Sequence, residues 1–127
     1  MKIKHIGIAV DSIEERLPVW EAFGLKLHHT EKVDSEGVTT AHLKVGEYEI
    51  ELLEPMGKDT PVGKFIDKKG PGIHHLALEV DDIEHEYIRL SQYGIEFLRV
   101  PEKEHWGGFI ATFKDIDQNI LQLIQKP

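Results

Sequence analysis

The sequence predicts an α+β fold built from two tandem βαβββ modules in a single domain. The first observation behind this prediction is a repeat, because His5–Asp11 (HIGIAVD) returns 70 residues later as His75–Asp81 (HLALEVD). The second is that each copy is followed by apolar residues at helical spacing and then by segments that alternate like strands. We therefore expect one domain over residues 1–127, with modules at 1–55 and 73–127 and a linker at 56–72.

The first module is expected to open with a strand at residues 5–10 and to continue into a helix. Asp11-Ser12 is a suitable N-cap for that helix, and Glu14 and Glu15 put negative charge where the helix dipole favours it. Gly24 ends the apolar residues of helical spacing, which are Ile13, Leu17, Trp20 and Phe23. Strands are then expected at 25–29, 38–45 and 48–53, with a hairpin turn between the last two.

The linker and the second module follow from the same reasoning. Glycines and prolines surround residues 62–66, which predicts a short helix within the linker. The second module repeats the first with a strand at 75–80 and a helix that follows Asp81-Asp82 and ends at Gly94. Further strands are expected at 95–100, 109–113 and 120–124.

Composition limits the functions that the chain can have. Asp and Glu outnumber Lys and Arg by 23 to 15, and without a basic stripe this acidic chain is a poor partner for nucleic acid. No segment approaches the ~20 apolar residues of a membrane span and no signal peptide is evident, so we expect a cytoplasmic protein that does not bind membranes. The absence of cysteine excludes thiolate ligands, whereas the 8 histidines leave imidazole, carboxylate and carboxamide groups for binding a metal.

The repeat also indicates a metal site. Duplicated modules often meet around a local twofold axis, so residues at equivalent positions can converge there. The equivalent pairs are His5 with His75 near the start of each module, and Glu51 with Gln122 near its end. If all four meet, they form a mixed shell of nitrogen and oxygen donors that suits one divalent ion such as Co, Zn, Ni or Mn.

Each of these residues also has a purely structural interpretation. A single histidine in an apolar strand is more often a hydrogen-bonded structural residue than a ligand, although two at equivalent positions of a repeat favour metal binding. Glu51 shares a strand face with Glu49, and that face could simply be exposed to solvent. Gln122 taken alone would be interpreted as structural. The repeat by itself establishes the architecture better than the chemistry.

Several motifs bear a resemblance to a known family. His5–Val10, Glu49–Pro55, and Thr60–Ile66 running through Gly72–His75 resemble the vicinal oxygen chelate superfamily, which includes glyoxalases, bleomycin-resistance proteins and ring-cleaving dioxygenases. The resemblance covers essentially the whole chain. The segment from Thr60 to Asp82 is most similar to the methylmalonyl-CoA epimerase group. This resemblance implies a cupped mixed sheet around a metal site.

The resemblance assigns the metal ligands to His5, Glu51, His75 and Gln122. Gln122 departs from the family pattern, in which glutamate usually stands at this position. A carboxamide can ligate a metal but cannot abstract a proton. Some epimerases carry glutamine at the position of Glu51 and glutamate at that of Gln122, so this chain keeps the same ligand types with the two repeats exchanged.

The function that the resemblance implies is a metal-dependent isomerase that inverts the alpha carbon of methylmalonyl-CoA by proton abstraction and return. Glu51 is then the candidate base. The partner acid is expected to be His105, in a loop where many epimerases have Ala-His-Gly. The second glutamate of some epimerases aligns with Thr40, which cannot serve as an acid. His42, two residues further along the same strand face, is therefore the alternative. His74 is expected to be structural.

The same resemblance implies an acyl-CoA substrate and a homodimer. Two other functions stay open at this point: a glyoxalase I-like isomerase, and a noncatalytic binding protein of the bleomycin-resistance type, which the loss of an acidic group at Gln122 would favour. His28 and His29 are expected at the surface or at the edge of the core.

Overall fold

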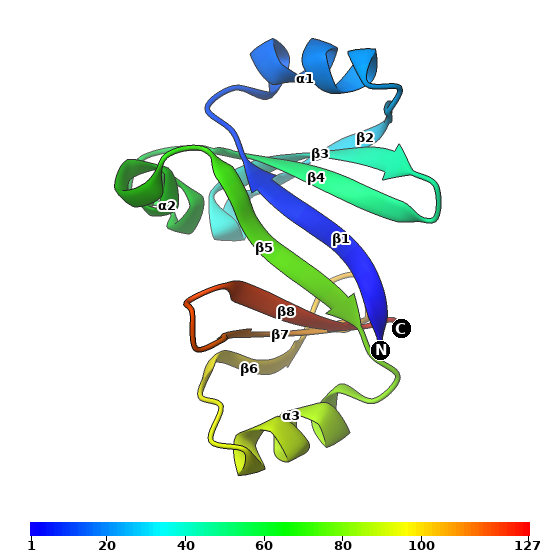
Figure 1. Cartoon of the computed structure of the whole chain (residues 1–127), viewed down its shortest axis with the longest axis vertical. Helices are drawn as coiled ribbons and strands as arrows, with labels where there is room; N and C mark the ends of the chain where they lie inside the picture. The colour runs from blue at the N-terminus through cyan, green and yellow to red at the C-terminus, as the bar shows by residue number, and fades with distance from the viewer. The chain divides into compact units, whose positions relative to one another are not determined.

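The structure, a computed structural model, describes residues 1–127 and contains eight strands and three α-helices (Figure 1). The order strand, helix and three strands occurs twice, with one helix between the two runs. The predicted α+β class and the two tandem βαβββ modules are therefore confirmed. None of the helices has the length and the apolar character that crossing a membrane requires.

The helices and strands lie close to their predicted positions. The first module consists of β1 (Lys2–Ala9), α1 (Ile13–Ala22), β2 (Lys26–Val33), β3 (Val38–Val45) and β4 (Tyr48–Pro55), with a 3₁₀ turn at Asp34–Glu36. The linker carries α2 (Pro61–Lys69). The second module consists of β5 (Gly72–Glu79), α3 (Ile83–Gln92), β6 (Phe97–Lys103), β7 (Phe109–Lys114) and β8 (Ile120–Gln125).

Several strand boundaries differ from prediction by two to four residues, and for two of them the hydrogen bonding gives the reason. β2 runs beyond residue 29 to Val33, because its second half pairs with β3 up to the Val33–Val38 position. β6 begins at Phe97 and not at residue 95, because the Ile95 amide donates to the Leu90 carbonyl and so belongs to the end of α3. Alternation in the sequence is too short at both places to fix these ends.

The chain divides into two compact units, which are described separately. One unit holds His5–His74, and the other holds Met1–Lys4 with His75–Pro127. In the first unit β2, β3 and β4 pair antiparallel in sequence order, and β4 also pairs parallel with β1. In the second unit β6, β7 and β8 do the same, and β8 pairs parallel with β5. Each unit therefore joins the first and last strands of its module side by side.

The side chains of β4 alternate between two faces, and the core beneath α1 covers one of them. Leu52 is fully buried with Val10, Ala41 and Leu43, and residues of α1 pack against this cluster. Burial of each such leucine contributes roughly 1.5–3 kcal/mol. Because neighbouring side chains of a strand point to opposite faces, Glu51 projects from the face away from α1, as the alternation in the sequence predicts.

Candidate functional site

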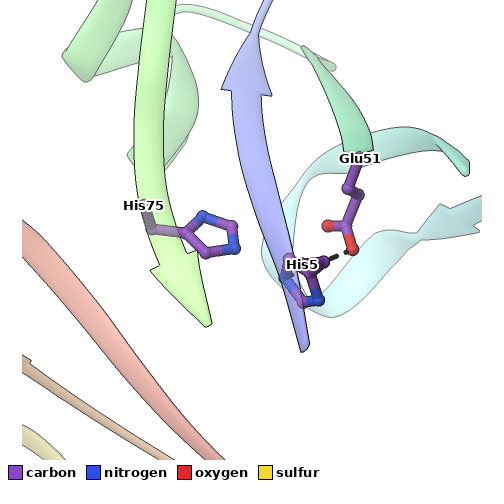
Figure 2. A group of neighbouring side chains, drawn as sticks. All are labelled: His5, Glu51 and His75. Atoms are coloured by element: carbon purple, nitrogen blue, oxygen red, sulfur yellow. Dashed lines mark ion pairs between the residues drawn. The ribbon is translucent and has the colours of Figure 1, made fainter. Parts of the chain in front are cut away.

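His5 and Glu51 come into contact through the parallel pairing of β1 with β4. In that pairing His5 lies opposite Glu49, and Glu51 lies opposite Gly7. The His5 Nε2 and Glu51 Oε2 atoms are 3.6 Å apart, and Figure 2 shows this ion pair as a dashed line. The side chains are only 10% and 14% exposed, so the pair is largely removed from solvent.

The environment of Glu51 disfavours its negative charge. Burial, with a further contribution from the nearby carboxylates of Glu49, Glu36 and Glu31, raises the pKa of Glu51 to about 7. A cation close to Glu51 would oppose all of these effects, because it would stabilise the ionised form. The site therefore has the charge of a cation-binding site.

His42 lies on the other side of Glu51. It is directly opposite Glu51 in the antiparallel pairing of β3 with β4, and its Nδ1 is 3.7 Å from Glu51 Oε2 and 3.6 Å from Glu49 Oε1. Its Nε2 is 3.0 Å from the hydroxyl oxygen of Thr40. Burial lowers the pKa of His42, and the neighbouring His29 lowers it further, which favours the neutral imidazole. His42, the alternative acid, and Thr40, which aligns with the second glutamate of some epimerases, are thus hydrogen-bonded neighbours.

The separation of His5 from Glu51 fits a shared metal ion better than a hydrogen bond. Nitrogen and oxygen ligands of one tetrahedral ion, with bonds of about 2.0–2.2 Å, lie roughly 3.3–3.6 Å apart. A hydrogen bond between the same atoms would be shorter than the observed 3.6 Å. One imidazole and one carboxylate of this unit are therefore suitably placed as two ligands of a divalent ion.

In the other unit, His75 and Gln122 lie on the equivalent strands. His75 on β5 is 4% exposed, and Gln122 on β8 is half-buried (Figure 2 draws His75 on its strand). Gln122 pairs with Ala77, two residues after His75, just as Glu51 pairs with Gly7, two residues after His5. The two units thus present their predicted ligands at the same register.

The two units differ in the residue that lies opposite the predicted oxygen ligand on the neighbouring strand. Glu51 faces His42 on β3, whereas Gln122 faces Thr112 on β7. An ionisable residue therefore lies opposite the carboxylate of Glu51 but not opposite the carboxamide of Gln122. A carboxylate can exchange protons with its surroundings, while a carboxamide cannot.

The predicted acid His105 is exposed on the turn between β6 and β7. The carbonyl of Gly108 accepts a hydrogen bond from the Glu104 amide, and the Glu104 carbonyl accepts one from Gly107, which closes the turn. Arg99 donates a hydrogen bond of 2.8 Å to the Glu104 carboxylate and so ties the turn to β6. His105 therefore stands on an ordered turn within its own unit, and its role stays a prediction.

His74 behaves as the sequence suggested. Its ring packs edge-on against Phe65 of α2, with ring centroids 4.7 Å apart. Burial lowers the pKa of His74, and the positive charge of Lys69 lowers it further. These contacts place His74 in the packing between α2 and the strand that follows it.

The sequence interpretation missed two polar residues with matching tasks. Glu54 accepts a hydrogen bond of 2.7 Å from the Ile13 amide, and Gln125 accepts one of 2.8 Å from the Ile83 amide. Each side chain therefore satisfies an amide in the first turn of its module's helix, in addition to the N-caps Ser12 and Asp82. Glu54 and Gln125 stand at equivalent positions of the repeat, and this equivalence could have predicted a shared structural role.

The sequence of the chain is similar to those of known proteins. Residues 4–113 match the sequence model of the Glyoxalase/Bleomycin resistance protein/Dioxygenase superfamily. The chain is 33% identical over 120 residues to the uncharacterized protein YqjC of Bacillus subtilis, covering 93% of this chain and 86% of that protein. It is 38% identical over 87 residues to the mitochondrial methylmalonyl-CoA epimerase of Dictyostelium discoideum, covering 66% of this chain and 52% of that protein.

A solved structure gives the same result for the fold. The Streptomyces coelicolor methylmalonyl-CoA epimerase, in complex with 2-nitronate-propionyl-CoA, superposes with a TM-score of 0.89 at 29% identity. The superposition covers 99% of this chain and 94% of that chain. The likeness therefore extends over both modules.

Proposed function

Because the chain belongs to the glyoxalase/bleomycin resistance/dioxygenase superfamily, we propose that it is a metal-dependent epimerase that inverts the alpha carbon of methylmalonyl-CoA. Epimerase relatives and an epimerase fold support an isomerase of this type. The observation that carries the proposal is the contact between His5 and Glu51, whose ligand atoms lie 3.6 Å apart in a buried, negatively charged setting.

In this proposal His5, Glu51, His75 and Gln122 would hold one divalent ion. The equal register of the two parallel strand pairs supports the choice of His75 and Gln122 as the second half of the ligand set. When bound, the ion supplies positive charge that stabilises negative charge developing on the oxygens of the substrate. The identity of the metal follows from availability as much as from these ligands.

The residues of the chain perform the proton transfers. Glu51 accepts the proton from the alpha carbon; the C–H electron pair moves into the thioester carbonyl and gives an enolate. His105 returns a proton to the opposite face of that carbon, which inverts its configuration. In the reverse direction the two residues exchange roles. A pKa near the working pH lets a group accept and donate a proton with similar ease. In the metal-free chain burial raises the pKa of Glu51 to about 7, and a bound cation would lower it from there.

His42 acts on Glu51 in this scheme. With its Nδ1 3.7 Å from Glu51 Oε2, the ring limits where the carboxylate can move. A carboxylate that both ligates a metal and accepts a proton must change position between the two tasks, so a neighbour that restricts it affects the rate. The acyl-CoA substrate, the cytoplasmic location and the assembly into a homodimer belong to the same proposal.

The deciding experiment is deuterium incorporation at C2 of methylmalonyl-CoA, measured by mass spectrometry with the purified full-length chain in heavy water. We expect exchange in the metal-loaded protein and its loss after treatment with a chelator. The hemithioacetal of glutathione and methylglyoxal is offered in parallel. Turnover of that adduct without exchange of the CoA ester would replace the epimerase by a glyoxalase I-like isomerase, and inactivity toward both would leave a binding protein.

A further inference from the structure

A second group of histidines lies on β2 and β3, and it shares His42 with the surroundings of Glu51. His29 on β2 pairs with His42 on β3, and Glu31 pairs with Thr40. His29 and Glu31 are two residues apart, so their side chains leave β2 on the same face. Both are exposed, while His42 is half-buried beneath them.

An irregularity in β2 brings a further histidine to this group. The register between β2 and β3 shifts between Leu27 and His29, so His28 has no partner of its own. Such an irregularity leaves one residue outside the ladder and re-aims its side chain. The Nδ1 atoms of His28 and His29 are accordingly 2.7 Å apart, which orients the ring of His29.

The geometry of the group suits a metal ion. His29, Glu31 and His42 each offer a ligand atom, and these atoms lie within 4.8 Å of one another. The rings of His29 and His42 are stacked, with centroids 4.1 Å apart and planes within 10°. Because the nitrogen lone pairs lie in the ring planes, one of the two rings has to turn out of this stack before both can bind one ion, and the exposed His29 has room to do so.

The local charge also favours a cation. Glu31, Glu36 and Glu49 together act on the buried Glu51, so this side of the first unit carries several carboxylates close to the histidine group. A single histidine pair on an edge strand would be a common surface feature. Here His29 lies directly opposite His42, and Glu31 follows His29 by two residues on the same face. These three side chains together form a more specific arrangement than two histidines alone.

We propose that His29, Glu31 and His42 form a second site for a divalent transition metal, separate from the site at His5 and Glu51. Two imidazoles and one carboxylate are the ligands of many zinc, nickel and copper sites. The ion would enter from solvent, because His29 and Glu31 are exposed. It would also link β2 to β3 beside Glu51, through the His42 ring that contacts both groups.

The test is the number of zinc ions bound by the full-length chain after it has been stripped with a chelator. Equilibrium dialysis against Zn²⁺ and measurement of the metal content give this number without any substrate. We expect two bound equivalents in the parent chain and one in the variant His29→Asn/Glu31→Gln. The matched control is His85→Asn/Glu84→Gln, which makes the same chemical changes at exposed positions of α3 and should keep two.

The variant His5→Asn separates this site from the one in the proposed function, and circular dichroism confirms that each variant is folded. One zinc equivalent that disappears in His29→Asn/Glu31→Gln but remains bound in His5→Asn supports the second site, even if the proposed function fails. Equal zinc content in the parent chain and in His29→Asn/Glu31→Gln overturns it. Loss of zinc from the α3 control to the same extent overturns it as well, because the binding would then be general surface binding.

Discussion

His5 Nε2 and Glu51 Oε2 lie 3.6 Å apart across the parallel pairing of β1 with β4, in a setting that is largely closed to solvent. At that distance the two groups do not form a good hydrogen bond, and the ionised carboxylate is held among other acidic residues. The arrangement is costly without a cation and favourable with one. Both the chemistry and the stability of the chain should therefore depend on Glu51.

The substitution Glu51→Gln should abolish most exchange at C2 of methylmalonyl-CoA. A carboxamide keeps the shape of the side chain but cannot accept the alpha proton, and loss of such a group typically lowers the rate by about 10²–10⁴-fold. The rate of deuterium incorporation at saturating substrate measures this effect. Glu47→Gln, in the exposed hairpin turn, removes the same charge and should leave the rate unchanged. Equal rates for Glu51→Gln and the parent chain would remove Glu51 from the proton path.

The stability of the metal-free chain should fall as the pH rises from about 4.5 to about 7. Folding raises the pKa of Glu51 from its ordinary value of 4.5 to about 7, so the folded chain binds more protons than the unfolded chain in this window. The cost is absent below the window and complete above it, where it reaches at most about 3 kcal/mol.

Glu51→Gln removes this titration and isolates its effect. At pH 8 the metal-free variant should have a free energy of unfolding about 1–3 kcal/mol higher than the parent chain, and at pH 4 the two should agree. Denaturant unfolding at the two pH values measures the difference. A constant difference between the chains at both pH values would mean that Glu51 titrates normally.

Gln122→Glu should strengthen metal binding. The change replaces a neutral oxygen donor by an anionic one at the position equivalent to Glu51, and we expect at least about a tenfold increase in affinity, or ~1.4 kcal/mol. Competition with a chromogenic chelator measures the affinity. Gln118→Glu, in the turn before β8, adds the same charge outside the ligand set. Equal gains in the two variants would show that only the net charge of the chain matters.

His105→Asn should lower the rate of full inversion more than the rate of exchange. Loss of the acid on one face leaves proton removal by Glu51 possible on the other face, so label can still enter from one enantiomer of the substrate. Stereochemical analysis of the product alongside its deuterium content separates the two rates. His85→Asn, exposed on α3, serves as the control. Parallel loss of both rates would assign His105 a role in binding, and no loss would remove it from the reaction.

Glu54→Ala and Gln125→Ala should each destabilise the chain by about 1 kcal/mol. Each removes the acceptor of a hydrogen bond from the first turn of a helix, at Ile13 or Ile83, and leaves that amide without its partner. Thermal unfolding measures the loss. Glu54→Gln keeps an acceptor oxygen at the same place and should recover most of the stability. A full loss in Glu54→Gln would show that charge, and not the hydrogen bond, is what Glu54 contributes.

Local pattern was enough to predict most of the fold. The recurrence of His5–Asp11 as His75–Asp81 identified the duplication, and apolar spacing with glycine ends located α1 and α3. Period-two alternation in β4 also predicted that Glu51 and Leu52 point to opposite faces. The repeat is found by comparing the sequence with itself, and the spacing and alternation depend on neighbours within a few residues, so a single sequence contains all of them.

The contacts of the site were decided by strand register, which local pattern does not contain. His42 lies opposite Glu51 because β3 and β4 pair in one of several possible registers, and a shift of one residue would turn the His42 side chain to the other face. The bulge at His28 that orients His29 toward its neighbours depends equally on how β2 meets β3. The sequence thus determined the repeated architecture and the candidate residues, whereas pairing between distant strands decided which of those side chains touch and which pKa values change.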